Sequence, residues 1–234
     1  MNNITLELKI RQRLNKGASN DYDNIEKWQI IEAFNKGTVD WCRRQLHGTN
    51  ISKTGDEQSK RRIDDLQILL TEAPIDVAKK DLYYISDGLP ANYFEWKRVS
   101  AEASNECCNN NQKLVIYLAE EANVDQLLRD NNKKPNYEWG ETFCTLKDGN
   151  LRIYTNDEFA IEKARLSYYK QPRRIEIVGV VDPYTNLLST VEVESEFKDD
   201  IVEVLIDEAS KILAGDMESV GQIQIQTGSV EQNN

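Results

Sequence analysis

The sequence has one histidine, His47, and four cysteines, none of which lie in a Cys-x-x-Cys spacing. A structural zinc site draws its ligands from local pairs of Cys or His, so the sequence predicts no zinc site. Cys107 and Cys108 are adjacent in an Asn-rich stretch, and we expect free thiols in a reducing compartment. His47 precedes Gly48 at an expected helix end, which favours a capping role over catalysis.

The common catalytic and nucleotide-binding motifs are also missing, since the chain has no phosphate loop, G-x-G-x-x-G, G-x-S-x-G or H-E-x-x-H. Acidic clusters at 21–23 and 194–200 stand at expected helix starts, where capping accounts for them. The segment 182–186 lacks the Asp-x-Asp-x-Asp-Gly run of a calcium loop and is typical of a turn around Pro183. The sequence therefore predicts no enzyme, no metal site and no cofactor.

Long hydrophobic runs are absent. No apolar stretch approaches the roughly 20 residues of a membrane span, and charged residues interrupt the first 14 positions, unlike a signal peptide. We expect no membrane partner and a protein that is made in the host cytoplasm and stays soluble or joins a soluble particle.

Acidic residues outnumber basic ones, 40 to 29, which gives a net charge of -11 and a pI of about 4.8. Non-specific binding to nucleic acid depends on Lys and Arg neutralising phosphates, so the charge argues against it. An acidic ring around a DNA path would instead let DNA slide without sticking. With 234 residues, the chain is long enough for one large domain or two small ones.

Apolar residues recur at helical spacing in the first 75 residues. Leu6, Ile10 and Leu14 predict a short helix, and a longer stripe from Ile25 to Leu46 predicts a second helix that Gly37 interrupts. A third helix is predicted from a stripe that Pro74 ends; its members are Ile63, Leu66, Leu70 and Ala73.

Residues 81–180 change character towards strands rich in aromatic and β-branched side chains. Candidate strands begin at Leu82, Tyr93 and Lys113, and two more flank the turn 147–150, which is the clearest hairpin signal. Further candidates are ARLSYYKQP and RRIEIVG on either side of Pro172, and VDQLLRD predicts one short helical turn. We expect an antiparallel sheet or a small sandwich here.

Helical periodicity returns near the C-terminus, with acids in the first turn and Gly215 at the expected end. A Gln/Asn-rich tail at 216–234 follows, and we expect it to order only on docking to a partner. The predicted fold class is α+β, a helical bundle of N- and C-terminal segments with a central antiparallel β-rich domain. The expected parts are 1–75 (helical), 81–180 (β-rich), 190–215 (a helix packing on the N-terminal helices) and 216–234 (an extended docking tail).

Candidate interface residues come from the C-terminal stripe, the tail and the end of the second helix. They are Phe197, Ile201, Leu205, Ile212, Leu213, Ile223, Ile225, Trp41, Arg43 and Arg44. Arg43 and Arg44, together with the basic run 60–62, admit two interpretations: contacts to DNA phosphates, or a solvated face with ion pairs between subunits. Three aromatic groups in the β-rich part also admit two interpretations, packing within the sheet or an exposed binding surface. They are Tyr83-Tyr84, Tyr93-Phe94-Trp96 and Tyr168-Tyr169.

Several segments taken together resemble one family. They are DYDNIEKWQIIEAFNKG and WCRRQL near the start, ANVDQLLRD, KPNYEWGETFCTLKDGNLRIYTNDEF, SYYKQPRRI and VVDPYTN in the middle, and VEVESEFKDDIVEVLIDEASKILAGDMES near the end. In these segments, which cover most of the chain, the sequence resembles the head-to-tail connector (ring or adaptor) proteins of crAss-like short-tailed bacteriophages.

The resemblance implies a structural virion protein at the portal vertex, forming a homo-oligomeric ring that is expected to be dodecameric. It implies contacts with the portal protein and with further connector or tail proteins, and passage of genomic DNA through the lumen without specific binding. Three other hypotheses stay open: another virion component such as a tail hub or minor capsid protein, a soluble enzyme with an acidic two-layer fold, and a nucleic-acid binder.

Overall fold

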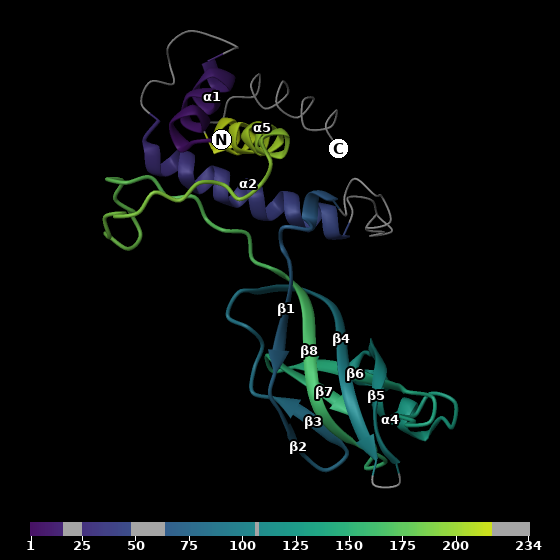
Figure 1. The fold of residues 1–234 in the computed structure, drawn as a ribbon. Coiled ribbons are helices and arrows are strands. Elements are labelled where there is room, and N and C mark those ends of the chain that lie inside the picture. Colours follow the sequence, from purple (N-terminus) through teal and green to yellow (C-terminus); the bar gives the residue numbers. More distant parts are fainter. Residues whose placement is uncertain (16–24, 48–63, 106–107, 217–234) are drawn as a thin grey trace. The chain divides into compact units, whose positions relative to one another are not determined.

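The computed structural model describes residues 1–15, 25–47, 64–105 and 108–216. The chain forms two compact units (Figure 1). The helical unit comprises residues 1–68 and 172–234, and the sheet unit comprises residues 69–171. Each unit therefore buries a core of its own.

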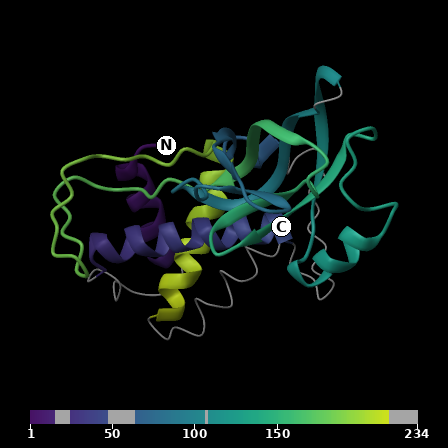
Figure 2. The same cartoon turned by 90° about the horizontal axis from the view of Figure 1, so that it is seen from below.

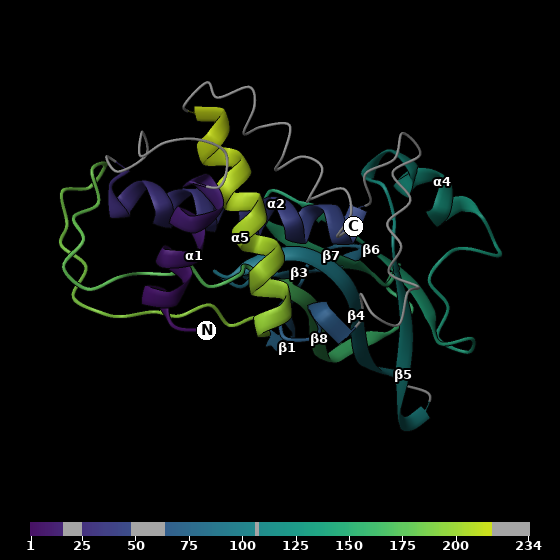
Figure 3. The same cartoon turned by 90° about the horizontal axis from the view of Figure 1, so that it is seen from above.

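Within its described residues the helical unit contains α1 (Asn3–Asn15), α2 (Lys27–His47) and α5 (Asp199–Asp216), and residues 64–66 are also helical. α5 packs against both of the others and crosses α2 (Figure 3), whereas α1 and α2 meet at only a few positions. Gly37 lies at the crossing, where an added Cβ would come within 3.3 Å of the Cβ of Glu208. Gly37 therefore permits close helix packing, and the expected interruption of α2 at this residue is wrong, because the helix runs through it.

Ion pairs join the helices at the rims of these contacts. The Nε of Arg13 on α1 lies 2.8 Å from a carboxylate oxygen of Asp207 on α5, and Arg44 on α2 pairs with Glu208 on α5. Asp207 and Glu208 are both buried, so these guanidinium groups supply the charge partners that buried carboxylates require.

Eight strands form one sheet in the sheet unit. They are β1 (Leu70–Ile75), β2 (Val77–Lys79), β3 (Tyr83–Ser86), β4 (Tyr93–Asn105), β5 (Cys108–Leu118), β6 (Glu141–Lys147), β7 (Asn150–Tyr154) and β8 (Ala160–Lys170). A short helical excursion, η1 (Glu121–Asn123) and α4 (Val124–Arg129), connects β5 to β6. That connection is long enough to make β5 and β6 parallel, whereas all the other neighbours are antiparallel.

The sheet curls almost into a barrel. Its strand order is β1-β8-β4-β5-β6-β7-β3-β2, so β1 and β2 stand at opposite edges, yet only Asp76 separates them in the chain. The sheet must bend round to bring these edges together. Along β4, Val99, Ala101 and Ala103 point into the apolar interior, and the residues between them point outwards.

The predicted hairpin is confirmed. β6 and β7 are antiparallel neighbours with Lys147 opposite Asn150, and the two residues between them, Asp148 and Gly149, have φ of 54° and 73°. Positive φ at both central positions is the geometry of the two-residue turns that match strand twist.

The predicted third helix is wrong in its C-terminal half: residues 64–66 are helical, but residues 70–75 form β1 and pair with β8. Pro74 does not end a helix here. It lies on an edge strand, where a missing N–H removes no bond on the open side. The candidate strand RRIEIVG is also wrong, because β8 ends at Lys170 and residues 175–179 belong to the helical unit.

The predicted fold class is likewise wrong. The described structure is dominated by one eight-stranded near-barrel sheet with few helices, rather than by a helical bundle around a central antiparallel domain. The prediction was based on the apolar stripes of helices. It missed the parallel pairing of β5 with β6 and the bending of the sheet, because both depend on pairing between distant segments.

Candidate interaction surfaces

A long loop of the helical unit, residues 175–193, is named here the strap. Its two halves run against each other beside the first turns of α2 (Figure 2), with Glu176 opposite Val193 and Val181 opposite Leu188. The amide of Gly179 donates to the carbonyl of Ser189 over 3.0 Å. The strap is therefore a hydrogen-bonded ribbon without regular strands.

Two buried amides fasten the strap to the helices. Asn35 of α2 accepts from the backbone N–H of Ile175 at 2.8 Å and donates to the carbonyl of the same residue at 3.3 Å. Asn3 of α1 donates to the carbonyls of Glu176 and Val193 at 2.9 and 3.0 Å. Both ends of the strap are thus held on a rigid base.

The strap nevertheless leaves large apolar side chains in solvent. Tyr184 is 78% exposed and Leu187 is 70% exposed. The full set is Val178, Val181, Tyr184, Leu187, Leu188 and Val191. Apolar side chains gathered on a fixed backbone indicate a protein-protein contact, whereas scattered ones need no explanation.

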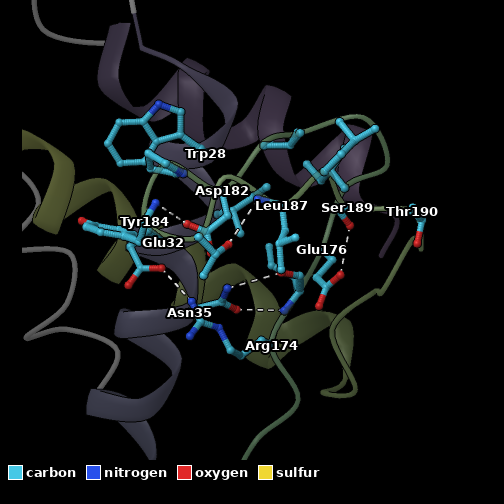
Figure 4. A pocket seen from close by; sticks show the side chains of 17 residues that line it. Trp28, Glu32, Asn35, Arg174, Glu176, Asp182, Tyr184, Leu187, Ser189 and Thr190 are labelled. Atoms are coloured by element: carbon cyan, nitrogen blue, oxygen red, sulfur yellow. Dashed lines mark hydrogen bonds and ion pairs between the residues drawn. The ribbon is translucent and has the colours of Figure 1, made fainter.

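A pocket of about 460 Å³ lies between the strap and α2 (Figure 4). Trp28 packs edge-to-face against Tyr184 with ring centroids 6.4 Å apart, and Arg174 donates to Glu32 over 2.8 Å. The N–H of Tyr184 donates to Asp182 and lowers the pKa of that carboxyl. The hydroxyl of Ser189, also in the lining, donates to Glu176 over 3.0 Å, and the pocket can accept a side chain of a partner.

A second surface lies on the outer face of the sheet unit, across β8, β4 and β5. Four cations there are named the basic face: Arg98, Lys113, Lys163 and Arg165. They line a shallow groove of about 460 Å³ together with two carboxylates, Glu72 and Glu102. In a chain with a net charge of -11, this surface is locally positive.

Half of the ten predicted interface residues are buried inside the helical unit. Trp41 packs edge-to-face on Phe197 with centroids 5.6 Å apart, and both are buried. Ile201, Leu205 and Leu213 of α5 are buried too. The stripe on α5 is therefore covered by the unit's own helices, and these five side chains have little surface to offer a partner.

The remaining predicted residues fall into two groups. Arg43, Arg44 and Ile212 line a cleft of about 600 Å³ between α2 and α5, where Arg44 is held by Glu208. Ile223 and Ile225 lie outside the described residues, as do most of the tail 216–234 and the basic run 60–62.

Two thiols of the described chain, Cys42 and Cys144, are free and buried. Burial raises the pKa of each to about 12, so neither is a reactive nucleophile. Among the described residues no group of His, Cys, Asp or Glu is arranged to hold a metal ion. No helix in that part of the chain is both long and apolar enough to cross a bilayer.

No protein-family model matches the chain, and no curated protein matches it either. A proposal for its function therefore depends on the surfaces described above and on the resemblance seen in the sequence.

Proposed function

We propose that the protein is a ring-forming head-tail connector of a short-tailed bacteriophage. It docks on the portal at the capsid vertex, joins the capsid to the tail and surrounds the path of the genome. The resemblance to connectors of crAss-like phages supports this proposal, and so does the combination of a rigid scaffold with exposed apolar contacts.

The observation that carries the proposal is the strap. Its backbone is tied to α1 and α2 through Asn3 and Asn35, while its side chains present apolar surface to solvent. A loop that needed only solubility would gain nothing from six exposed apolar residues. A subunit of a permanent assembly buries such residues against its neighbours.

The charge of the chain suits the same role. A lumen lined by subunits of net charge -11 repels phosphates, so DNA passes without being retained. In a ring, the faces that meet are different surfaces of the same chain, so each subunit needs two distinct contact regions.

The test is reconstitution with purified portal encoded by the same genome. We expect the full chain to co-sediment with portal, and a chain lacking 216–234 to stay folded by circular dichroism but to lose portal binding. Continued binding of the truncated chain would refute docking through the tail. A full chain that never binds portal and is absent from purified particles refutes the connector function, whereas its location elsewhere in the particle favours a tail hub or minor capsid protein.

A further inference from the structure

The basic face brings together side chains from three strands through the sheet register. Lys163 on β8 and Lys113 on β5 both stand opposite Glu102 on β4, so the three form one row across the strands. In the next row, Arg165 stands opposite Ser100. Neighbouring strands lie about 5 Å apart, so the cations form a compact grid.

The carboxylates in this groove do not neutralise it. Glu72 is 3.2 Å from Arg165 and also accepts from Ser167 at 3.2 Å, which leaves Glu102 as the second acid among four cations. Four cations and two carboxylates give a net charge of +2. A partner for this groove must therefore bring negative charge.

Apolar side chains border the same groove. Val115 is 66% exposed and Tyr117 is 39% exposed. Lys113, Val115 and Tyr117 occupy every second position of β5. The three side chains therefore point to the same outer side of the sheet. The partner must therefore combine negative charge with apolar side chains, because a purely polar anion would leave this border uncovered.

The strap has that chemistry. Residues 175–193 contain the acids Glu176, Asp182 and Glu192 and no Lys or Arg. Asp182 lies at the exposed tip next to Tyr184, and Leu187 projects from the same turn. Charge and apolar surface on the strap thus complement charge and apolar surface on the basic face.

We infer that the strap of one copy docks on the basic face of a second copy. The two surfaces differ, so the contact is head-to-tail, and repeated copies close into a ring or extend into a filament. This inference deepens the proposed function by naming the contact that joins neighbouring subunits of the ring. Stable contacts of this kind bury about 800 Å² on each partner.

The experiment uses two variants of the full chain, each with one surface reversed. The basic-face variant is Lys163→Glu with Arg165→Glu, and the strap variant is Leu187→Lys with Val191→Lys. All four side chains are exposed, so we expect both variants to fold. Sedimentation should show self-association of the unaltered chain, and in each variant self-association weaker by about 10- to 100-fold, because like charges then face each other.

Mixing the two variants gives the decisive result. The intact strap of one variant fits the intact basic face of the other, and the introduced lysines face the introduced glutamates, so the mixture should regain the association that neither variant shows alone. A control with Lys80→Glu and Arg129→Glu makes the same change in net charge at exposed positions away from the groove and should associate like the unaltered chain.

Other outcomes overturn the inference. An unaltered chain that stays monomeric at high concentration, with cross-links only inside one copy, shows docking within a single chain. A basic-face variant that loses salt-dependent binding to DNA but still self-associates identifies nucleic acid as the occupant. The self-association assay does not use portal, so the two proposals can fail separately. A chain that assembles with itself but never binds portal refutes only the connector function. A chain that binds portal, but whose two variants do not pair, refutes only the contact between strap and basic face.

Discussion

The two units bury different kinds of polar group. In the helical unit the buried polar side chains include the carboxylates of Asp207 and Glu208 and the amides of Asn3 and Asn35. In the described part of the sheet unit they are hydroxyls, on Ser86, Thr142, Thr145, Thr155 and Ser167. The helical unit therefore depends on directional partners for charges and amides, and the sheet unit depends mainly on apolar packing.

This difference suits the position of the strap. Asn3 and Asn35 hold a segment that has no regular strand or helix of its own, so directional bonds replace the missing ladder. In the sheet unit a backbone ladder runs across eight strands, and side chains are left to fill the interior. Truncating an apolar side chain should therefore harm the sheet unit, and removing an amide should harm the strap.

The largest effect is expected for Phe143→Ala in the sheet unit. Phe143 is fully buried, stacked on Tyr154 with centroids 4.8 Å apart and close to Tyr117 at 6.0 Å. Losing the ring leaves a cavity and should lower the free energy of unfolding of this unit by about 3–5 kcal/mol. Hydrogen exchange read by peptide mass spectrometry should show faster exchange in β6 and β7, with α5 unchanged.

A matched control in the same unit is Trp139→Ala. Trp139 is 59% exposed, so its removal should change stability by less than about 0.5 kcal/mol. If Phe143→Ala also accelerated exchange throughout α5, the two units would share one cooperative transition, and the comparison would fail.

A smaller effect is expected for Asn35→Ala in the helical unit. The change removes both bonds to Ile175 and leaves a buried N–H and a buried carbonyl without partners, at a cost of about 1–3 kcal/mol. Exchange should speed up in the strap and stay constant in the sheet unit. Asn15→Ala, at the exposed end of α1, is the control. Unchanged exchange in the strap would show that Asn35 does not hold it.

Local signals in the sequence were sufficient for features made by neighbouring residues. The hairpin at 147–150 follows from Asp148-Gly149, because these residues accept positive φ. The stripe of α5 correctly marks a buried face. An apolar stripe does not show, however, whether it is buried by the same chain or by a partner. The sequence alone therefore could not decide whether Phe197 and Leu205 belong to an interface or to the core.

Features made by distant residues were missed. The stripe through Leu66 and Leu70 matches a helix locally, but pairing with β8, almost 100 residues later, turns Leu70–Ile75 into a strand. The basic face is missed for the same reason, since Lys113 and Lys163 are brought to either side of Glu102 only through strand register. One signal was present: on β8 the exposed Lys163 and Arg165 alternate with the buried Ala164 and Leu166, which marks an outward face.

The smallest effect uses the two buried thiols as reporters, because each unit holds one. Cys42 lies in α2 and Cys144 in β6, and desolvation is the main cause that raises the pKa of each to about 12. In the unfolded chain a thiol ionises near pH 8.5. Each buried thiol therefore contributes stability that is complete below about pH 8.5 and is lost progressively as the pH rises towards 12.

Salt separates the two reporters. In a chain with Cys107→Ser and Cys108→Ser, labelling by a disulfide reagent at constant pH measures the opening of each unit. About 1 M salt screens the partly exposed ion pairs of α5, such as Lys9 with Glu203, and should raise the labelling rate of Cys42 by about two- to fivefold. Cys144, surrounded by apolar side chains, should label at an unchanged or lower rate. Equal acceleration of both thiols would show that charged contacts stabilise the units alike, against the contrast drawn from their buried groups.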